Sequence, residues 1–142
     1  MQRLGVRLGL AMGVGDVVAL VGPLGSGKTT FAQGLARGLG VADDRHVVSP
    51  SFALVNEHPG RIPFVHVDVY RIRTPAELPE LGLEEAYDRA ATAIEWADRF
   101  PDLLPADHLQ ITLAVDGIDQ RQLELQPTGP RSRILAAALT RT

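Results

Sequence analysis

Apolar and polar residues alternate along the chain in a way that predicts strands and helices in turn. The continuous apolar run at 17–21 is typical of a buried parallel strand. After a glycine-rich stretch, Phe31, Leu35 and Leu39 recur at i, i+4 and i+8, which places them on one face of a helix. Shorter runs predict further strands at 51–57, 64–70, 92–96, 109–115 and 121–126, and helices near 4–12, 74–87 and 132–140.

Two turn signals indicate how some of these strands pair. Pro59-Gly60 separates the second and third strands, and Asp116-Gly117 separates the last two. Short connections that contain glycine join antiparallel neighbours, whereas the first strand has a parallel character. We therefore predict an α/β fold with three layers and a mixed parallel and antiparallel sheet. A chain of 142 residues suits a single domain over residues 1–142.

Composition and charge exclude several classes of protein. The apolar fraction of 45% and the charged fraction of 22% are ordinary for a globular protein. There is no cysteine, which excludes disulfides, thiolate catalysis and zinc sites with cysteine ligands. The formal net charge of −3 gives no overall attraction to RNA or to an anionic membrane. Any role on RNA must then depend on a local patch or on a protein partner.

The first residues weakly resemble a secretory signal. Arg3 and Arg7 precede an apolar stretch at 8–14, but this stretch is short and broken by glycine. We expect instead a short amphipathic helix whose apolar side chains, Leu4 and Leu8 among them, face inward. No apolar run approaches the length of a membrane span, so we expect a cytoplasmic protein that does not act at a membrane.

The glycine-rich stretch is a complete G-x-x-x-x-G-K-T motif over residues 22–29. Between an apolar strand and a new helix, this motif binds nucleotide phosphates. Glycines allow backbone N–H groups to turn toward phosphate oxygens, and the start of the helix adds its dipole. Lys28 can reach the β- and γ-phosphates and the Thr29 hydroxyl can ligate Mg²⁺, so we predict a P-loop NTPase core that binds ATP and Mg²⁺. The residues expected at the phosphates are Gly22, Leu24, Gly25, Ser26, Gly27, Lys28, Thr29 and Thr30.

Two acidic residues at apolar strands are candidates for the catalytic centre. Asp68 lies between valines, where a carboxylate is unfavourable unless it is paired or near a metal. Glu95 follows the next apolar strand, a loose Walker B arrangement that brings a carboxylate close to the metal. The alternatives are structural. Asp68 can cap the following loop, and Glu95 can form an ion pair with Arg89 or Arg99.

Other positions have less specific signals. Ser51 lies in a Ser-Pro-Ser-Phe segment, where a switch loop would hold the attacking water, although a plain turn is equally consistent. Arg121 follows the last turn and can reach nucleotide phosphates or ribose, or be a solvated strand residue. The single tryptophan, Trp96, is expected in the core, and His58 and His66 are expected to be structural or solvated.

Four segments, taken in order, resemble one family. They are the motif at 22–31, Ser-Pro-Ser-Phe at 49–52, His-Val-Asp-Val-Tyr-Arg at 66–71 and Glu95-Trp96, supported by Leu81-Gly82 and Leu104-Pro105. This set resembles TsaE, the family of small P-loop ATPases required for the bacterial threonylcarbamoyladenosine (t6A) modification of tRNA. The likeness covers nearly the whole chain from Leu4 onward. Many families share the P-loop, so the other three segments make the match specific.

The resemblance implies an activity, its partners and the roles of some residues. It places Glu95 on Mg²⁺ and Asp68 on the nucleotide side, and it favours a catalytic role for Ser51 beside these two. It implies an ATPase that is weak alone and coupled to partner proteins of the TsaD–TsaB type in the t6A threonylcarbamoyltransferase complex. Contact with tRNA would then be indirect, through that complex.

The sequence departs from the family pattern at three places. Pro23 stands where the family mostly has Asp, and Ser51-Phe52 where it often has Thr-Tyr. Family members usually carry an additional strand ahead of the first predicted helix, part of it near the nucleotide base, and this sequence begins almost at that helix. For a chain that starts at Met1 we therefore expect poor discrimination between ATP and GTP, within about tenfold.

Two other functions are consistent with a P-loop. A small-molecule kinase would usually carry an arginine-rich lid, and the acidic segment at 71–99 has no such cluster. A nucleotide-gated binding module would use the same loop without hydrolysis. The sequence has no Asn-Lys-x-Asp guanine signature, which favours ATP. Phosphate release with and without candidate partners and acceptors would separate the three functions.

Overall fold

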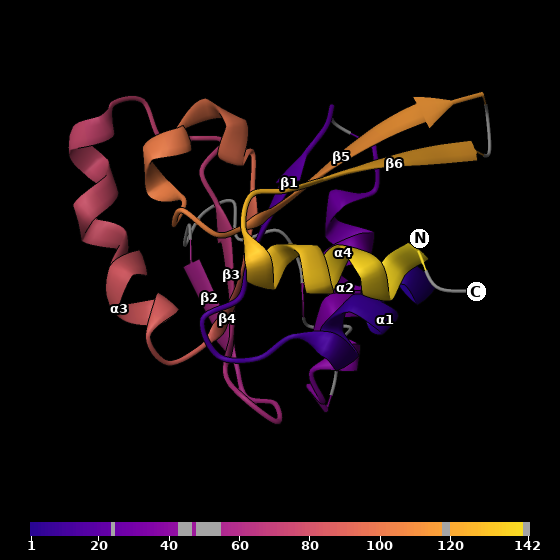
Figure 1. The fold of residues 1–142 in the computed structure, drawn as a ribbon. Helices are drawn as coiled ribbons and strands as arrows, with labels where there is room; N and C mark the ends of the chain where they lie inside the picture. Colours follow the sequence, from indigo (N-terminus) through magenta and orange to yellow (C-terminus); the bar gives the residue numbers. More distant parts are fainter. Residues whose placement is uncertain (24, 43–46, 48–54, 118–119, 141–142) are drawn as a thin grey trace.

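A six-stranded sheet lies at the centre of the protein, as seen in a computed structural model (Figure 1). The structure describes residues 1–142 except 24, 43–46, 48–54, 118–119 and 141–142, and the side chains at 116, 120 and 121 are also outside the described part. The strands are β1 (Val17–Val21), β2 (Val55–His58), β3 (Phe64–Asp68), β4 (Ala91–Glu95), β5 (Leu109–Asp116) and β6 (Gln120–Pro127).

Four parallel strands form the middle of the sheet. The order is β2-β3-β4-β1-β5-β6, in which β3, β4, β1 and β5 run parallel. The edge strands β2 and β6 are each antiparallel to their neighbour, and each pair is joined by one of the turns identified in the sequence. The predicted mixed sheet is therefore confirmed.

Helices cover both faces of the sheet and complete the three predicted layers. The helical elements are α1 (Gln2–Ala11), α2 (Lys28–Gly38), η2 (Pro75–Leu81), α3 (Leu83–Tyr87), η3 (Ala97–Arg99), η4 (Pro101–Leu103) and α4 (Pro130–Thr140). One face of the sheet packs against α1, α2 and α4. The opposite face packs against the segment that contains η2, α3, η3 and η4, and Figure 1 shows α3 on the other side of the strands from α1, α2 and α4.

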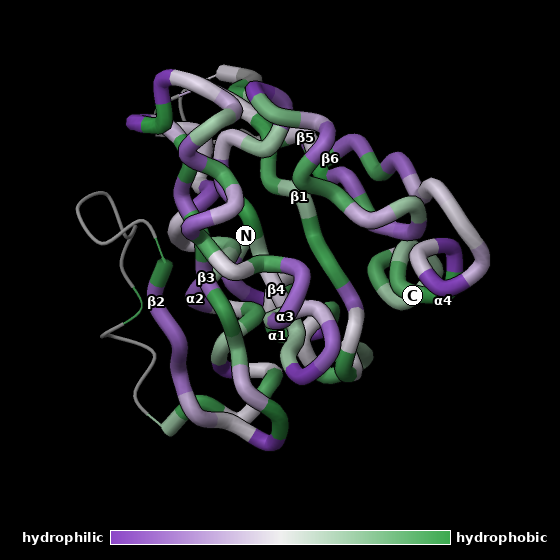
Figure 2. Tube along the Cα trace, turned by 90° about the vertical axis from the view of Figure 1, so that its left-hand side faces the viewer, coloured by the Kyte–Doolittle hydropathy of each residue, from purple (hydrophilic) through white to green (hydrophobic). Residues whose placement is uncertain are grey.

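The alternation of side chains along β1 explains why both faces are covered. Val18 and Leu20 pack on the side of α1, α2 and α4, whereas Val17 and Ala19 pack on the side of α3. In Figure 2, β1 is hydrophobic along its whole length, while β2 at the sheet edge is mostly hydrophilic. A strand buried on both faces has a continuous apolar sequence, which is the signal that identified β1.

The predicted apolar faces of the first two helices lie in the core. Phe31, Leu35 and Leu39 have no exposed surface, so the face predicted for the helix after the P-loop is confirmed. The amphipathic helix predicted at the start is α1, and its Leu8 is buried together with Met12 at the helix end. These side chains fill the space between the two helices and the sheet.

Helices α1 and α2 cross at close range because glycines face one another. A Cβ at Gly5 or Gly9 would overlap the backbone of α2, and a Cβ at Gly34 or Gly38 would overlap the backbone of α1. Backbones can approach this closely only where no side chain separates them. Helix α1 therefore fixes the position of α2, whose first turn completes the P-loop.

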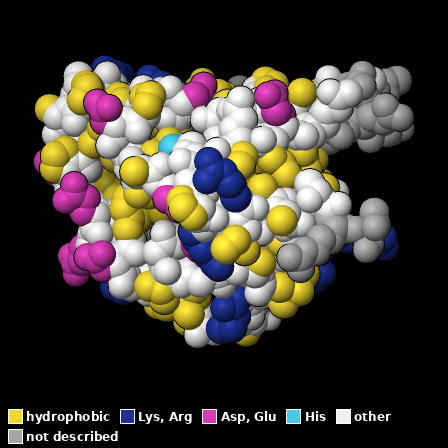
Figure 3. All heavy atoms as spheres, viewed as in Figure 1, with side chains coloured by type: hydrophobic (Ala, Val, Ile, Leu, Met, Phe, Trp, Pro, Cys, Tyr) yellow, Lys and Arg dark blue, Asp and Glu magenta, His cyan; other side chains and the backbone are white. Residues whose placement is uncertain are grey.

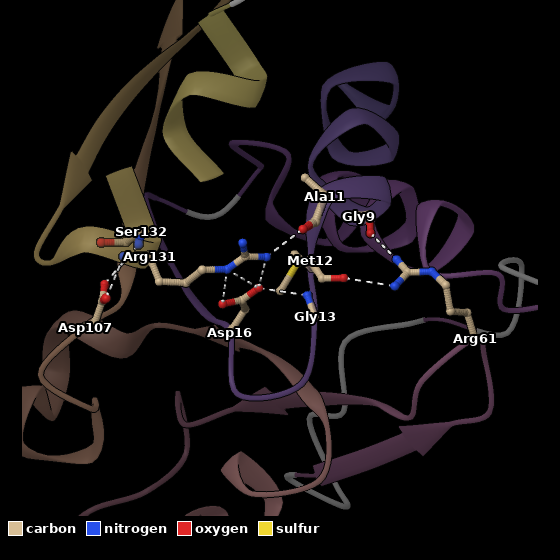
Figure 4. A network of polar contacts seen from close by, with 9 residues as sticks. All are labelled: Gly9, Ala11, Met12, Gly13, Asp16, Arg61, Asp107, Arg131 and Ser132. Atoms are coloured by element: carbon tan, nitrogen blue, oxygen red, sulfur yellow. Dashed lines mark hydrogen bonds and ion pairs between the residues drawn. The ribbon is translucent and has the colours of Figure 1, made fainter. Parts of the chain in front are cut away.

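Two arginines hold the carboxyl end of α1, as Figure 4 shows. Arg61 donates to the carbonyl oxygens of Gly9 at 2.8 Å and Met12 at 3.0 Å. Arg131 donates to the carbonyl oxygen of Ala11 at 2.8 Å. The last carbonyls of a helix have no partner within the helix, so these two side chains supply the missing donors.

Two carboxylates organise the start of α4 around the same arginine. The Arg131 guanidinium forms a forked contact with Asp16, whose oxygens lie 2.9 Å from Nη2 and 3.0 Å from Nε. Asp107 accepts from the backbone N–H groups of Arg131 at 2.8 Å and Ser132 at 3.0 Å. A hydrogen bond with the Ser132 side chain, together with these two backbone hydrogen bonds, holds the pKa of Asp107 below its usual value. Asp107 thus caps α4 from a distant segment of the chain.

The helical region predicted at 74–87 differs from the structure. It begins as expected, with Thr74 and Glu77 in a capping box and Pro75 in the first turn. However, η2 is a 3-10 helix with Pro79 inside it, and Gly82 at a φ of +67° separates it from the short α3. Proline removes a backbone donor and glycine turns the chain, so no continuous α-helix forms.

Smaller differences concern the ends of elements. The strand predicted at 51–57 overlaps β2, and residues 51–54 of that prediction lie outside the described part. Strand β3 ends at Asp68, two residues before the predicted end, and α4 begins two residues early. No helix in the described part of the chain is long and apolar enough to cross a membrane.

Candidate nucleotide-binding site

The P-loop joins β1 to α2 through three glycines in unusual backbone conformations. Gly25 and Gly27 have φ values of +77° and +103°, and Gly27 is the N-cap of α2. A Cβ at Gly22 would lie 2.5 Å from the carbonyl oxygen of Leu113 and 2.8 Å from Ser26 Oγ. Side chains at these positions would strain the loop or fill it. The glycines therefore keep the backbone of the loop open toward the start of α2.

Lys28 folds back into this loop. Its Nζ donates to the carbonyl oxygens of Gly22 at 2.5 Å and Pro23 at 3.0 Å, and it lies 3.9 Å from the centroid of the Trp96 ring. Burial lowers the pKa of the ammonium group, while the nearby carboxylates of Glu95 and Asp68 act in the opposite direction. Lys28 is thus a buried cation whose hydrogen-bond partners are neutral.

The carboxyl ends of three parallel strands meet beside Lys28. The register places Glu95 at the end of β4 next to Leu20 of β1 and next to Asp68 of β3. Thr29 Oγ1, in the first turn of α2, lies 3.4 Å from Glu95 Oε1. Ligands in open α/β sheets bind at this edge, outside the carboxyl ends of the strands. The structure therefore brings the predicted metal ligands, Thr29 and Glu95, to one place.

Asp68 is next to the site and also has a local structural role. It is buried, and its Oδ1 accepts a hydrogen bond from the backbone N–H of Tyr70 at 2.8 Å. That bond is the loop cap considered as the structural alternative from the sequence. The carboxylate lies at the same sheet edge as Glu95, so capping and a contact with nucleotide are compatible.

Glu95 is held by a histidine and not by either of the arginines considered from the sequence. Arg89 pairs with Glu57, and Arg99 donates to the carbonyl oxygen of Tyr70. His66 Nε2 lies 2.5 Å from Glu95 Oε2, and both side chains are buried. The expectation that His66 is merely structural or solvated missed this contact.

A signal for this contact was present in the sequence. Positions 66 and 68 alternate onto one face of the same strand, and the next apolar strand ends in Glu95. If these two strands are parallel neighbours, a histidine at 66 faces the acid. The pairing of the strands, however, could be known only from the structure.

Trp96 closes one side of the P-loop instead of lying deep in the core. It has a φ of +64°, the one positive value among the described residues other than glycine. Its ring is only partly buried, contacts Lys28 and lies 4.8 Å from the Tyr70 ring. Its backbone N–H donates to the carbonyl oxygen of Leu20 at 3.1 Å. A strained backbone at the end of a central strand is typical of a functional site.

The remaining predicted residues are distributed as follows. Thr30 is exposed in the first turn of α2. Leu24 and Ser51 lie outside the described residues. Arg121 has its backbone in β6 opposite Val115, but its side chain is outside the described part.

The residues of the loop fit a nucleotide with Mg²⁺. Ser26 Oγ is buried inside the loop and has no hydrogen-bond partner among the described atoms, so a phosphate oxygen could accept from it. No group of three or more His, Asp or Glu side chains that could hold a metal is found in the described regions. Mg²⁺ would then need phosphate and water oxygens besides Thr29 and Glu95, which is how this ion usually binds in nucleotide sites.

The layer on the other face of the sheet is strongly acidic. Between 75 and 103 the exposed charged residues are seven acids and two arginines. In Figure 3 acidic side chains gather over the side where Figure 1 places α3. The acids are Glu77, Glu80, Glu84, Glu85, Asp88, Asp98 and Asp102. Such a surface repels the phosphate backbone of a nucleic acid.

Comparison with known proteins identifies close relatives. The model of the family described as "Threonylcarbamoyl adenosine biosynthesis protein TsaE" matches residues 1–123. The chain is 40% identical over 129 residues to the tRNA threonylcarbamoyladenosine biosynthesis protein TsaE of Bacillus subtilis, covering 89% of this chain and 79% of that protein. It is 39% identical over 131 residues to the protein of the same name from Nostoc sp., covering 88% and 78%.

A solved structure agrees with the sequence relatives. The fold resembles the crystal structure of Bacillus subtilis YdiB with a TM-score of 0.79 and 33% sequence identity. The match covers 98% of this chain and 86% of that chain. This likeness is consistent with a P-loop NTPase-like fold.

Proposed function

This chain belongs to the TsaE family of threonylcarbamoyladenosine biosynthesis proteins, and we propose that it is a Mg²⁺-dependent ATPase of that pathway. The observation that carries the proposal is the meeting of Lys28, Thr29 and Glu95 at the start of α2. A buried cation, a hydroxyl and a carboxylate at this edge are the groups that phosphoryl transfer needs. Membership of the family does not by itself say which residues of this chain carry the activity.

Each part of the loop has a task in this proposal. The backbone N–H groups of the loop and of the first turn of α2 bind the phosphates, and Lys28 exchanges its carbonyl partners for phosphate oxygens. Mg²⁺, when bound, neutralises charge on the β- and γ-phosphates. Thr29 and Glu95 hold that ion, and Asp68 lies on the nucleotide side. Ser51 orients the attacking water and Arg121 contacts phosphate or ribose.

We propose that turnover is low without partners. Fast phosphoryl transfer usually needs a second cation at the γ-phosphate, and Arg121 is the single candidate that the sequence offers for this. The partners are proteins of the TsaD–TsaB type in the t6A complex. The acidic layer and the net charge of −3 favour contact with tRNA through those partners and not directly.

The test is ATP hydrolysis by the full chain, alone and with TsaD- and TsaB-type proteins and tRNA. We expect slow, Mg²⁺-dependent phosphate release alone and faster release with the partners. Lys28→Ala should remove both rates. Nucleotide binding without hydrolysis under every condition would instead favour a gated binding module. Phosphate transfer to a small acceptor, in place of release, would favour a kinase.

A further inference from the structure

We propose that His66 is the positioning residue for Glu95, which fixes one oxygen of the carboxylate so that the other faces the metal position. This inference rests on the proposed function, because it gives Glu95 the role of a Mg²⁺ ligand. It gives a role to a histidine that the sequence pattern predicted to be structural or solvated. The contact with His66 determines the orientation of the carboxylate and not its charge.

The two oxygens of Glu95 have different surroundings. Oε2 lies 2.5 Å from His66 Nε2, within strong hydrogen-bond distance. Oε1 lies 3.4 Å from Thr29 Oγ1, at the outer limit of a hydrogen bond. One oxygen is therefore held firmly, and the other points toward the hydroxyl expected on the same ion. A carboxylate that was free to rotate would not keep one oxygen at His66 and the other toward Thr29.

The surroundings of the imidazole ring determine which nitrogen carries the proton. His66 has no exposed surface, and Nδ1 has no hydrogen-bond partner among the described atoms. An ionised carboxylate only accepts hydrogen bonds, so Nε2 must donate to Oε2. A proton on Nε2 meets this requirement. Partners of metal ligands commonly fix a ligand in this way.

The ring itself is held in place by the sheet. Phe64, two residues earlier on β3, stacks on it with centroids 6.0 Å apart and planes 13° apart. The Phe64 ring also stacks with His58 of β2, at a centroid distance of 6.1 Å. The neighbour of His66 on β4 is Ala93, whose small side chain leaves room for the ring to reach Glu95. His58 thus stacks with the same Phe64 ring from the neighbouring strand, and it provides a matched control.

The first test measures binding of the non-hydrolysable analogue AMPPNP to the full chain, in EDTA and across a Mg²⁺ titration. For His66→Leu we expect affinity in EDTA within about twofold of wild type, and a Mg²⁺ requirement raised about 10- to 100-fold. His66→Gln places an amide N–H near the Nε2 position and should recover most of the loss. His58→Gln should behave as wild type.

Three further measurements test the role of His66 if His66→Leu does not fold. His66→Asn is polar but too short to reach Glu95, so it should resemble the leucine variant while His66→Gln does not. In a Glu95→Gln background, replacing His66 should not raise the Mg²⁺ requirement further, because the carboxylate it positions is gone. In the nucleotide-free protein, ¹⁵N NMR should show that His66 carries a proton on Nε2.

Several results would overturn the inference. These are an unchanged Mg²⁺ requirement in His66→Leu, an equal loss of affinity with and without Mg²⁺, no difference between His66→Gln and His66→Asn, or an Nε2 that carries no proton. The proposed ATPase function is tested separately by hydrolysis in the wild type. A wild-type protein that binds Mg²⁺ and AMPPNP without hydrolysing ATP would contradict the proposed function and leave the role of His66 to be decided by the binding data.

Discussion

The ammonium nitrogen of Lys28 lies 3.9 Å from the centroid of the Trp96 ring and bonds to two carbonyl oxygens of its own loop. A cation over an aromatic face and between neutral acceptors is well placed to leave them for a stronger anionic partner. Trp96 is the only tryptophan of the chain. The fluorescence of that one residue therefore reports on the position of Lys28.

We expect ATP with Mg²⁺ to change the Trp96 fluorescence in a saturable way, because Lys28 moves from the ring to the phosphates. Lys28→Ala should weaken ATP binding by about 2–5 kcal/mol, about 30-fold or more in Kd, since the triphosphate loses its buried counter-charge. Calorimetry measures the loss independently of the fluorescence. Wild-type affinity in Lys28→Ala would contradict the assignment of the P-loop.

The lowered pKa of Lys28 predicts a pH dependence of binding. In the free protein, burial puts the pKa of Lys28 below its usual value of 10.5. In the alkaline range between that lowered value and 10.5, the unfolded chain binds more protons than the folded one, so this group makes folding more favourable as pH rises. A triphosphate beside the ammonium raises its pKa again. Binding should then take up protons in that window and weaken as pH rises through it.

Calorimetry in buffers of different ionisation enthalpy measures this proton uptake. Lys28→Arg is the matched control, because a guanidinium does not lose its proton in this range. We expect proton uptake in the wild type and none in the arginine variant. Equal uptake in both proteins would assign the titration to another group.

Glu95→Gln should separate binding from hydrolysis. The amide can still accept from His66 through its oxygen, but its NH₂ group then faces Thr29 and cannot ligate Mg²⁺. We expect ATP affinity without Mg²⁺ close to that of the wild type and turnover lower by on the order of 100-fold. Both quantities are measured on one preparation. Unchanged turnover would make Glu95 a structural residue.

Local patterns were enough to predict the P-loop, the hairpins and the apolar face of α2. Each depends on residues close together in the sequence, such as Gly22, Lys28 and Thr29 in one loop. The start of η2 was also visible in its capping box. The 3-10 geometry was not predicted, because it depends on Pro79, which removes a backbone donor inside a region that otherwise favours a helix.

The contacts that complete the site join distant parts of the chain. Predicting them requires the order of the strands in the sheet. His66 and Glu95 are 29 positions apart, and they meet only because β3 and β4 are parallel neighbours in one register. Arg131 and Asp16, which help to anchor α1, are 115 positions apart. The sequence contains the residues of such pairs but not the pairing itself.

The glycine crossing between α1 and α2 gives a last prediction, on stability. A Cβ at Gly34 would overlap the carbonyl oxygen of Gln2 and lie 2.9 Å from the Cα of Gly5. These are backbone atoms, so α1 must shift as a whole. Alanine favours a helix over glycine by about 1 kcal/mol, whereas overpacking a tight contact costs about 1–3 kcal/mol. We therefore expect Gly34→Ala to lower the free energy of unfolding and the Tm, and to weaken ATP binding by displacing α2.

Gly13→Ala is the matched control for this prediction. A Cβ at Gly13 would meet its nearest atoms, Arg131 Nη2 and Asp16 Oδ2, at 3.9 Å, which is ordinary van der Waals contact. The same substitution there should leave stability unchanged or raise it by about 0.4–1 kcal/mol, because it restricts the unfolded chain. Thermal unfolding and ATP titration of both variants decide the matter. If Gly34→Ala were as stable as Gly13→Ala and bound ATP equally well, the close crossing of α1 and α2 would not be what holds the P-loop helix in place.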